Sequence, residues 1–184
     1  MITSSITTAT TTISGATRTV YLALGSNLGD RTALLAEAAA RLDAAGVAIT
    51  ARSPIYETDA VADEPQPAYL NAVLRAETAL PAREVLSLAL RIERQLGRVR
   101  PPGRLKAARS IDIDLLLYGD AVIDEAAGGD PAAAPALSVP HPALLERPFV
   151  RIPLADVAAP GLCHPITGDR LDSAPVSPGV RRVE

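Results

Sequence analysis

The order of the strand-like and helix-like segments is the feature that most constrains how this chain can fold. Apolar side chains alternate where strands are expected and recur every three to four residues where helices are expected. Asp30 is placed to cap the first helix, and Gly46 and Gly97 are placed to end the two helices. The order is strand, helix, strand, strand, helix, strand, over residues 18–24, 31–45, 47–57, 68–79, 81–96 and 109–118.

This order predicts an α+β fold of the ferredoxin-like βαββαβ type, an antiparallel sheet with both helices on one face. The length of 184 residues suits one domain, which we place at residues 18–165. Its C-terminal extension, residues 138–160, contains a short helical piece. Residues 1–17 are rich in Thr and Ser and are predicted to be a disordered leader. Residues 120–137 are a low-complexity insertion, and the polar, Pro-rich residues 166–184 are predicted to be a loose tail.

Composition limits the cellular setting and the partners. The net charge of −3 gives no general attraction to nucleic acid. Cys163 is the single cysteine, so no internal disulfide can form and a reducing cytoplasm fits; it is not expected to be a nucleophile. No apolar stretch approaches the ~20 residues of a membrane span. We therefore expect a cytoplasmic monomer that binds neither nucleic acid nor a membrane.

Two carboxylates stand on the last strand of this pattern. Asp112 and Asp114 have the same parity, so they project side by side, roughly 6.5 to 7 Å apart, from a strand that is otherwise apolar. Such a pair is costly unless something compensates its charge. A hydrated, frayed strand is one explanation. The other explanation is a divalent cation. A site with few protein ligands suits Mg²⁺, which is then held by the carboxylates together with substrate phosphates.

A basic loop directly precedes this strand. A solvated basic loop is the simplest interpretation, but a polyphosphate with Mg²⁺ would satisfy the cations and the carboxylates at once. Two metal ions could share two such carboxylates. The residues alone therefore indicate phosphoryl or nucleotidyl transfer. The cations are Arg98, Arg100, Arg104, Lys106 and Arg109.

Five stretches, in order and at plausible spacing, resemble the family of 6-hydroxymethyl-7,8-dihydropterin pyrophosphokinases of folate biosynthesis. The resemblance runs from about residue 20 to residue 160. The stretches are Leu24-Gly25-Ser26-Asn27-Leu28-Gly29, Pro67-Ala68-Tyr69-Leu70-Asn71, Arg91-Ile92-Glu93 with Gly97-Arg98-Val99-Arg100, Arg109-Ser110-Ile111-Asp112-Ile113-Asp114-Leu115, and Val139-Pro140-His141-Pro142 with Arg147-Pro148-Phe149-Val150.

The resemblance implies a reaction as well as a ferredoxin-like fold. ATP would give its β,γ-pyrophosphoryl unit to the hydroxymethyl oxygen of the pterin and leave as AMP. Asp112 and Asp114 would hold two Mg²⁺ ions, and Arg98 and Arg109 would be catalytic. Such an in-line attack needs positioning and charge neutralisation more than covalent help.

The resemblance also divides the other site residues between two substrates. An Asn amide suits the edge of a heterocycle, because it offers a donor and an acceptor. Structural roles remain open for His141 after a proline, for Asn71 at a strand edge and for Phe149 in the core. The ATP side would comprise Glu93, Arg98, Arg100, Arg109, His141 and Arg147, and the pterin side Gly25, Thr58, Asp59, Val61, Tyr69, Asn71 and Phe149.

The chain departs from the family pattern in its loops. Lys106-Ala107-Ala108-Arg109 stands where the family usually has Trp-Gly-Pro-Arg, and the chain has no Trp, so one expected stacking wall for the pterin is missing. A weakened family member is therefore one alternative. A palm-type nucleotidyltransferase is another. In that class, however, the Gly-Ser turn lies shortly before the aspartates, whereas Ser26 of this chain lies far before Asp112. An RNA-binding ferredoxin-like module is the third, although such modules need aromatics on central strands.

Overall fold

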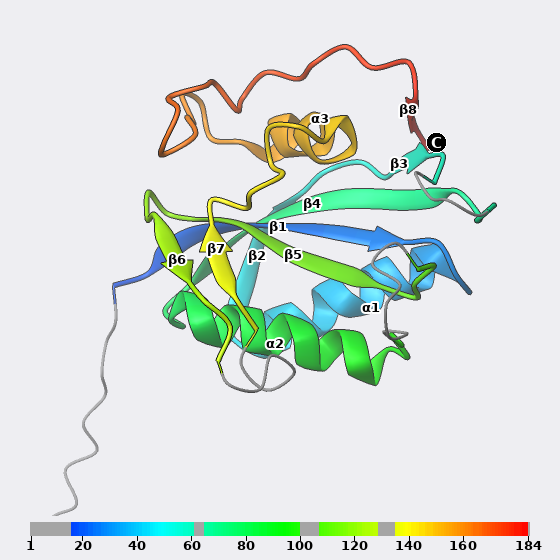
Figure 1. The fold of residues 1–184 in the computed structure, drawn as a ribbon, viewed down its shortest axis with the longest axis horizontal. Coiled ribbons are helices and arrows are strands. Elements are labelled where there is room, and N and C mark those ends of the chain that lie inside the picture. The colour runs from blue at the N-terminus through cyan, green and yellow to red at the C-terminus, as the bar shows by residue number, and fades with distance from the viewer. Residues whose placement is uncertain (1–15, 61–64, 100–106, 129–134, 184) are drawn as a thin grey trace, which may run out of the picture.

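A six-stranded sheet forms the centre of the molecule in the computed structural model, which describes residues 16–60, 65–99, 107–128 and 135–183. A separate two-stranded sheet lies beside it (Figure 1). The elements are β1 (Arg18–Ser26), α1 (Arg31–Ala44), β2 (Val47–Arg52), β3 (Tyr56–Thr58), β4 (Tyr69–Thr78), α2 (Ala82–Gln95), β5 (Asp112–Tyr118), β6 (Ile123–Glu125), β7 (Leu137–Val139), α3 (Pro148–Val157) and β8 (Val180–Arg182).

The strands of the main sheet lie in the order β5-β1-β4-β3-β8, and β2 also pairs with β4. Every pairing is antiparallel. The register places Gly25 of β1 opposite Asn71 of β4 on one side and opposite Asp112 of β5 on the other. Three residues that are far apart in the sequence are therefore neighbours at one end of the sheet.

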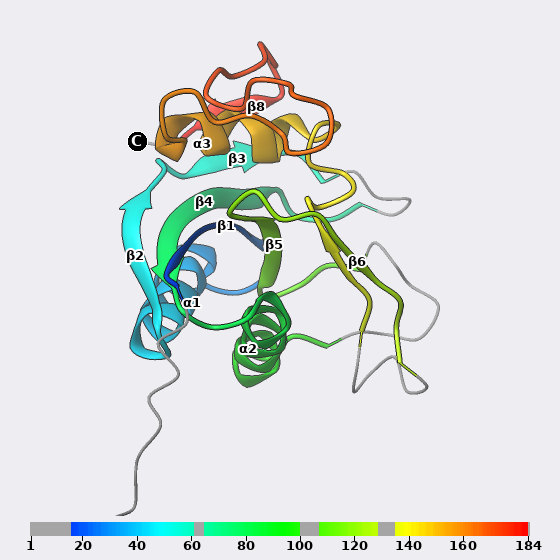
Figure 2. The ribbon, with the colours of Figure 1, turned by 90° about the vertical axis from the view of Figure 1, so that its left-hand side faces the viewer.

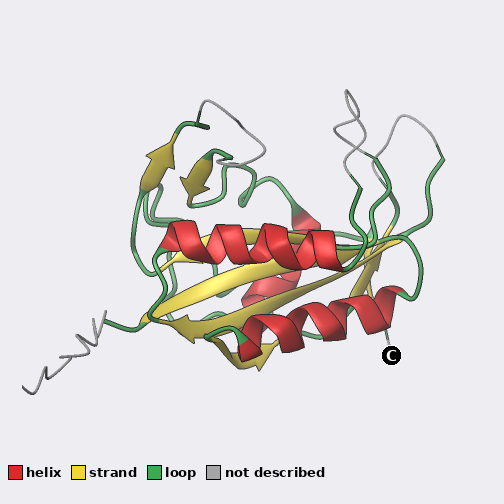
Figure 3. Ribbon diagram, turned by 90° about the horizontal axis from the view of Figure 1, so that it is seen from below, coloured by secondary structure: helices red, strands yellow, loops and turns green. Residues whose placement is uncertain are grey.

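Helices α1 and α2 cover one face of the sheet (Figure 3). Asp30 caps α1 by accepting a hydrogen bond from the Ala33 amide at 3.0 Å. Gly46 and Gly97 follow the two helices at φ 92° and 81°, a conformation that glycine adopts without strain. Together with the strand order, this arrangement confirms the predicted ferredoxin-like α+β fold.

Helix α3 and the segment after it cover the opposite face of the sheet (Figures 1 and 2). Leu154 of α3 and Leu171 beyond it are fully buried in a second core. The chain then returns to the sheet, where β8 pairs with β3. This packing differs from the predicted loose tail, because Leu171 has an apolar site to fill and β3 has a free edge to pair.

Two further segments differ from the sequence-based expectation. The strand predicted at 47–57 is divided into β2 and β3 around Pro54, and Ser53 bridges the division by accepting from the Val73 amide at 2.9 Å. The two ends of the insertion predicted at 120–137 pair as β6 and β7. Among the described residues, no helix has the length and apolar content that a membrane crossing needs.

Candidate active site

The two aspartates of β5 face a cavity at the end of the sheet. Ile113 and Leu115, of the alternate parity, are 2% and 4% exposed and pack into the core between the sheet and the helices. Asp112 and Asp114 therefore project to the other side, where both line the cavity. The alternation of acidic and apolar residues at the start of β5 thus places both carboxylates in the cavity.

Asp112 is neutralised by two arginines. Arg109 donates from Nη1 to Oδ2 at 2.6 Å, and Arg98 donates to Oδ1. Burial acts to raise the pKa of Asp112, but the two guanidinium groups outweigh it and hold the pKa below its usual value. Asp112 is therefore a carboxylate held ionised by cations from both ends of the basic loop.

Asp114 has a different environment although it lies only two residues away. Its Oδ2 is 3.7 Å from Nη1 of Arg147 and 3.8 Å from Nε2 of His141. Burial and the neighbouring charge of Asp112 raise the pKa of Asp114. A divalent cation beside both carboxylates would relieve this repulsion, and two carboxylates with substrate phosphates are a set that Mg²⁺ accepts. The pair therefore fits the predicted metal.

Glu93 and His141 support this cluster from behind. Glu93 is 2% exposed, accepts from the Ile113 amide at 2.8 Å through Oε1 and pairs with Arg98. Burial lowers the pKa of His141, which favours neutral imidazole. The Nδ1 of His141 accepts a hydrogen bond from the Ala143 amide at 3.1 Å. The neutral ring is therefore assigned with its hydrogen on Nε2, which faces Asp114.

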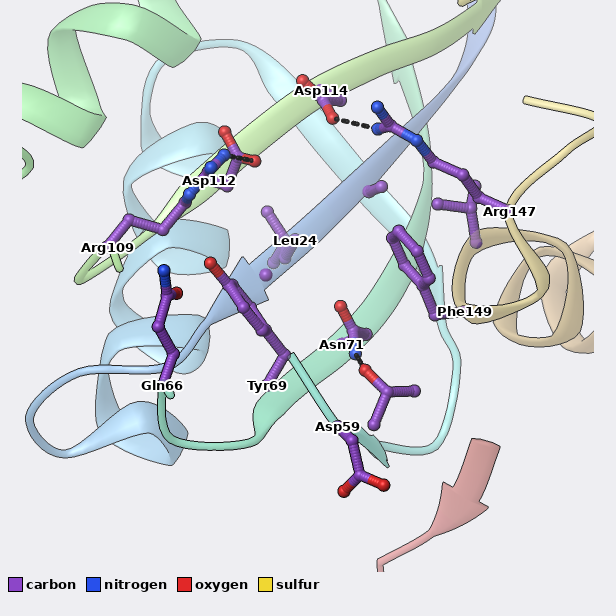
Figure 4. A pocket seen from close by; sticks show the side chains of 14 residues that line it. Leu24, Asp59, Gln66, Tyr69, Asn71, Arg109, Asp112, Asp114, Arg147 and Phe149 are labelled. Atoms are coloured by element: carbon purple, nitrogen blue, oxygen red, sulfur yellow. Dashed lines mark hydrogen bonds and ion pairs between the residues drawn. The ribbon is translucent and has the colours of Figure 1, made fainter. Parts of the chain in front are cut away.

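The cavity has a volume of about 340 Å³, and its second end lies around Asn71, away from the carboxylate pair of β5 (Figure 4). Asn71, 6% exposed, donates from Nδ2 to the Thr58 hydroxyl at 2.9 Å. Tyr69 and Phe149 supply aromatic surface beside it. A Cβ on Gly25 would lie 3.5 Å from Oδ1 of Asn71, so glycine keeps this corner open.

Most of the residues predicted from the sequence meet in this cavity. Its lining includes Gly25, Thr58, Asp59, Tyr69, Asn71, Arg109, Asp112, Asp114, Arg147 and Phe149. Glu93, Arg98 and His141 stand behind the carboxylates, in contact with them or with their strand. Val61 and Arg100, together with Arg104 and Lys106, lie outside the described residues.

The sequence interpretation missed several residues of the site. Ala23, Leu24, Gln66 and Val150 also line the cavity. Asn27 was quoted only as part of a motif, yet its side chain bonds to Gln66 and to the Arg109 backbone. Strand parity could have indicated Ala23, which shares a face with Gly25.

Residues 21–159 match the model of the 7,8-dihydro-6-hydroxymethylpterin-pyrophosphokinase (HPPK) family. The chain belongs to this family. The match starts within β1 and ends just after α3, so it includes every described residue that lines the cavity.

Curated HPPK relatives match over most of their length. The 2-amino-4-hydroxy-6-hydroxymethyldihydropteridine pyrophosphokinase of Methylorubrum extorquens is 42% identical over 140 residues, 75% of this chain and 81% of that one. The Bacillus subtilis protein of the same name is 41% identical over 138 residues, 74% of this chain and 76% of that one.

Other relatives are much longer than this chain. The folic acid synthesis protein fol1 of Pneumocystis carinii is 36% identical over 149 residues, 81% of this chain but 18% of that protein. A Plasmodium falciparum HPPK-DHPS crystal structure has a TM-score of 0.64 and 16% identity, and the match covers 85% of this chain and 42% of that one. This structural likeness supports the HPPK fold. The nucleotidyltransferase and RNA-binding alternatives are not favoured.

Proposed function

We propose that the chain transfers the β,γ-pyrophosphoryl unit of ATP to 6-hydroxymethyl-7,8-dihydropterin in folate biosynthesis. The hydroxymethyl oxygen attacks the β-phosphorus, the bond from that phosphorus to the α-phosphate oxygen breaks, and AMP leaves. The hydroxyl proton is released, and no residue is assigned as its base. Family membership supports this diphosphokinase reaction, with ATP as co-substrate.

One observation carries the proposal. The carboxylate and arginine cluster around Asp112 opens into the same cavity as the Asn71–Thr58 pair. The charged end suits a polyphosphate, because arginine forks bind phosphate oxygens. The other end suits a flat heterocycle that needs a donor, an acceptor and aromatic contact. A single cavity could therefore hold both substrates side by side.

The charged end of the cavity is the proposed ATP side. Asp112 and Asp114 would hold two Mg²⁺ ions, which would neutralise charge on the transferring phosphates. Arg98 and Arg109, which bind Asp112 in this structure, would reorient to bind phosphate oxygens. The Nε2 of His141 and the guanidinium of Arg147 would also donate hydrogen bonds to ATP. Glu93 would orient Arg98, and Arg100, which is not among the described residues, would also bind ATP.

The other end is the proposed pterin side. Asn71 would bind the heterocycle edge, and its bond to Thr58 would fix the amide orientation. Tyr69 and Phe149 would contact the ring, and Gly25 would leave room for it. Asp59 would lie at the rim of the pterin pocket. Val61, which is not among the described residues, would also contact the pterin. Arg147, whose Cζ lies 5.8 Å from the centre of the Phe149 ring, would join the two ends.

We also propose that residues 18–165 form the pyrophosphokinase domain and that the protein acts as a cytoplasmic monomer without nucleic acid.

An AMP-release assay tests the function. The protein is incubated with ATP and Mg²⁺, with and without 6-hydroxymethyl-7,8-dihydropterin, and the nucleotides are separated. We expect AMP only when the pterin is present, and no ADP. ADP formation, or AMP release that ignores the pterin, would contradict the proposal. Pterin-dependent but very slow release would instead identify a weakened family member.

A further inference from the structure

The C-terminal segment lies beyond the part of the chain that matches the HPPK family. That match ends at residue 159, whereas the structure describes the chain to residue 183. Leu171 anchors the segment in the second core, which also contains residues of α3, and β8 follows at the edge of the main sheet (Figure 1). The segment is therefore built into the fold at a strand that borders the cavity.

Strand β8 gives β3 a second neighbour. Thr58 of β3 pairs with Tyr69 of β4 on one side and with Val180 of β8 on the other. The Val183 amide extends the contact by donating to the Ile55 carbonyl at 2.8 Å. A strand of three residues has few hydrogen bonds of its own, so pairing on both sides restricts its motion.

Arg181 adds a charged contact between β8 and the cavity rim. Its Nη2 lies 3.2 Å from Oδ1 of Asp59 and 3.9 Å from Oε2 of Glu57. Glu57 also binds Nη1 of Arg31 at 3.1 Å, and the same atom of Arg31 donates to the Ala68 carbonyl at 2.8 Å. Charges thus link β8, β3 and the residue before β4.

These links converge on the proposed pterin side. Thr58 and Asp59 line the cavity, and the Thr58 hydroxyl holds Asn71. We propose that β8, through its backbone pairing and Arg181, is a positioning element that sets the affinity of this pocket for the pterin. The proposal rests on the proposed function for the identity of the ligand. Holding the wall in place before the ligand arrives lowers the ordering cost of binding.

The expected effects follow from the strength of these contacts. Exposed ion pairs are weak, so Arg181→Ala is expected to raise the pterin Kd by about two- to fivefold. Arg181→Lys keeps the charge and should recover most of that loss. A chain that ends at Gly179 loses the strand pairing as well and should bind the pterin about tenfold more weakly. Leu171 stays in place, so this chain is expected to fold.

Arg182→Ala is the matched control. It removes a neighbouring arginine whose side chain projects to the other face of β8 and lies near Tyr56. We expect the pterin Kd of this variant to match that of the wild type.

The measurement is pterin affinity by equilibrium titration in the presence of a non-hydrolysable ATP analogue, followed by steady-state kinetics of AMP release. We expect the pterin Kd and KM to rise, while kcat and the KM for ATP stay within about twofold. An unchanged pterin Kd in the truncated chain would overturn the proposal. An equal rise of the pterin Kd in Arg182→Ala would also overturn it. So would a lower kcat together with higher KM values for both substrates and a lower Tm.

The titration separates this proposal from the proposed function. If the wild type binds the pterin but releases no AMP, the proposed reaction fails, and the Kd ratios still decide the role of β8. If the wild type releases pterin-dependent AMP and the variants bind as it does, the reaction stands and the positioning role fails.

Discussion

Asp112 and Asp114 are alike in the sequence but differ in what their charge does for the fold. Asp112 accepts hydrogen bonds from Arg98 and Arg109, whereas burial and the neighbouring charge of Asp112 raise the pKa of Asp114. We expect Asp112→Asn and Asp114→Asn each to lower kcat by about 10² or more, because each removes a ligand of the proposed Mg²⁺ ions that would neutralise the transferring group.

The same two variants should differ in stability. Asp112→Asn weakens two charged hydrogen bonds and is expected to cost about 1–3 kcal/mol, whereas Asp114→Asn relieves repulsion and should cost nothing. Urea unfolding and AMP release, measured on both variants, check the two expectations. A near-normal rate in either variant would remove that carboxylate from the proposed metal site.

Asn27 joins two walls of the cavity although it does not line it. It is 1% exposed, donates from Nδ2 to Gln66 and to the Pro67 carbonyl, both at 3.2 Å, and accepts from the Arg109 amide at 2.7 Å. Asn27→Ala should lower kcat by about tenfold or more through Arg109, since small displacements at a reacting centre are costly. It should also cost about 1–3 kcal/mol of stability.

The measurement is the steady-state kinetics of AMP release together with urea unfolding. A loss of stability in Asn27→Ala with an unchanged kcat would show that Asn27 does not act through Arg109.

The sequence predicted the charged residues of the site better than the residues that position them. Asp112, Asp114 and Arg109 were evident because strand parity and a cluster of cations are local patterns. Asn27 sits in a glycine-rich turn, where an Asn is usual, and its partners are 39 and 82 residues away. Such a role depends on the tertiary fold and leaves no local signal.

At the level of elements, the segment after α3 shows where a sequence pattern fails. Leu171 is fully buried in the same core cluster as Val150, Leu154 and Val157 of α3. Leu171→Ala should therefore cost about 2–5 kcal/mol of unfolding free energy, as for other buried leucines. Val176, 99% exposed, provides the control, and Val176→Ala should change the unfolding free energy by less than about 0.5 kcal/mol. A small effect at Leu171 in urea unfolding would restore the interpretation as a loose tail.

The elements that were predicted well carry their own signals. Helices α1 and α2 have periodic apolar faces and a glycine just after each end, and β1, β4 and β5 alternate or are continuously apolar. β8 lacks such a signal, because Val180–Arg182 is short, basic and Pro-flanked. Its strand conformation comes from the free edge of β3, so it is a product of the assembled sheet.

Over the whole molecule, the order of the elements predicted two layers, and the structure has a third. Helices α1 and α2 cover one face of the sheet, and α3 with the C-terminal segment covers the other (Figure 2). The cavity forms where β1 ends and β4 and β5 begin, beside the start of α3, which supplies Phe149 and Val150. The third layer therefore completes one wall of the proposed site, and its stability matters for function.

We expect His164 to make the stability of this third layer depend on pH. It is 7% exposed, and its Nδ1 accepts from the amides of Ile166 and Thr167 at 3.3 and 3.2 Å. Burial, with a smaller contribution from Arg151, lowers the pKa of His164, and Asp169 offsets this only in part. The folded state therefore favours neutral imidazole. The neutral imidazole of His164 contributes its full stabilisation above about pH 6.5, the pKa of His164 in the unfolded chain. This contribution is lost as the pH falls from there through the pKa in the folded chain, which is lower.

His164→Asn provides the test, because an Asn oxygen can accept the same two amides and does not titrate. The unfolding free energy of the wild type should fall as pH drops from ~7 to ~5 more steeply than that of the variant, by up to about 1.4 kcal/mol per pH unit for one proton. His141, whose pKa is also lowered, is present in both proteins, so the difference between the two curves isolates His164. Parallel curves would mean that His164 titrates alike in the folded and unfolded chains and that its buried imidazole does not couple the third layer to pH.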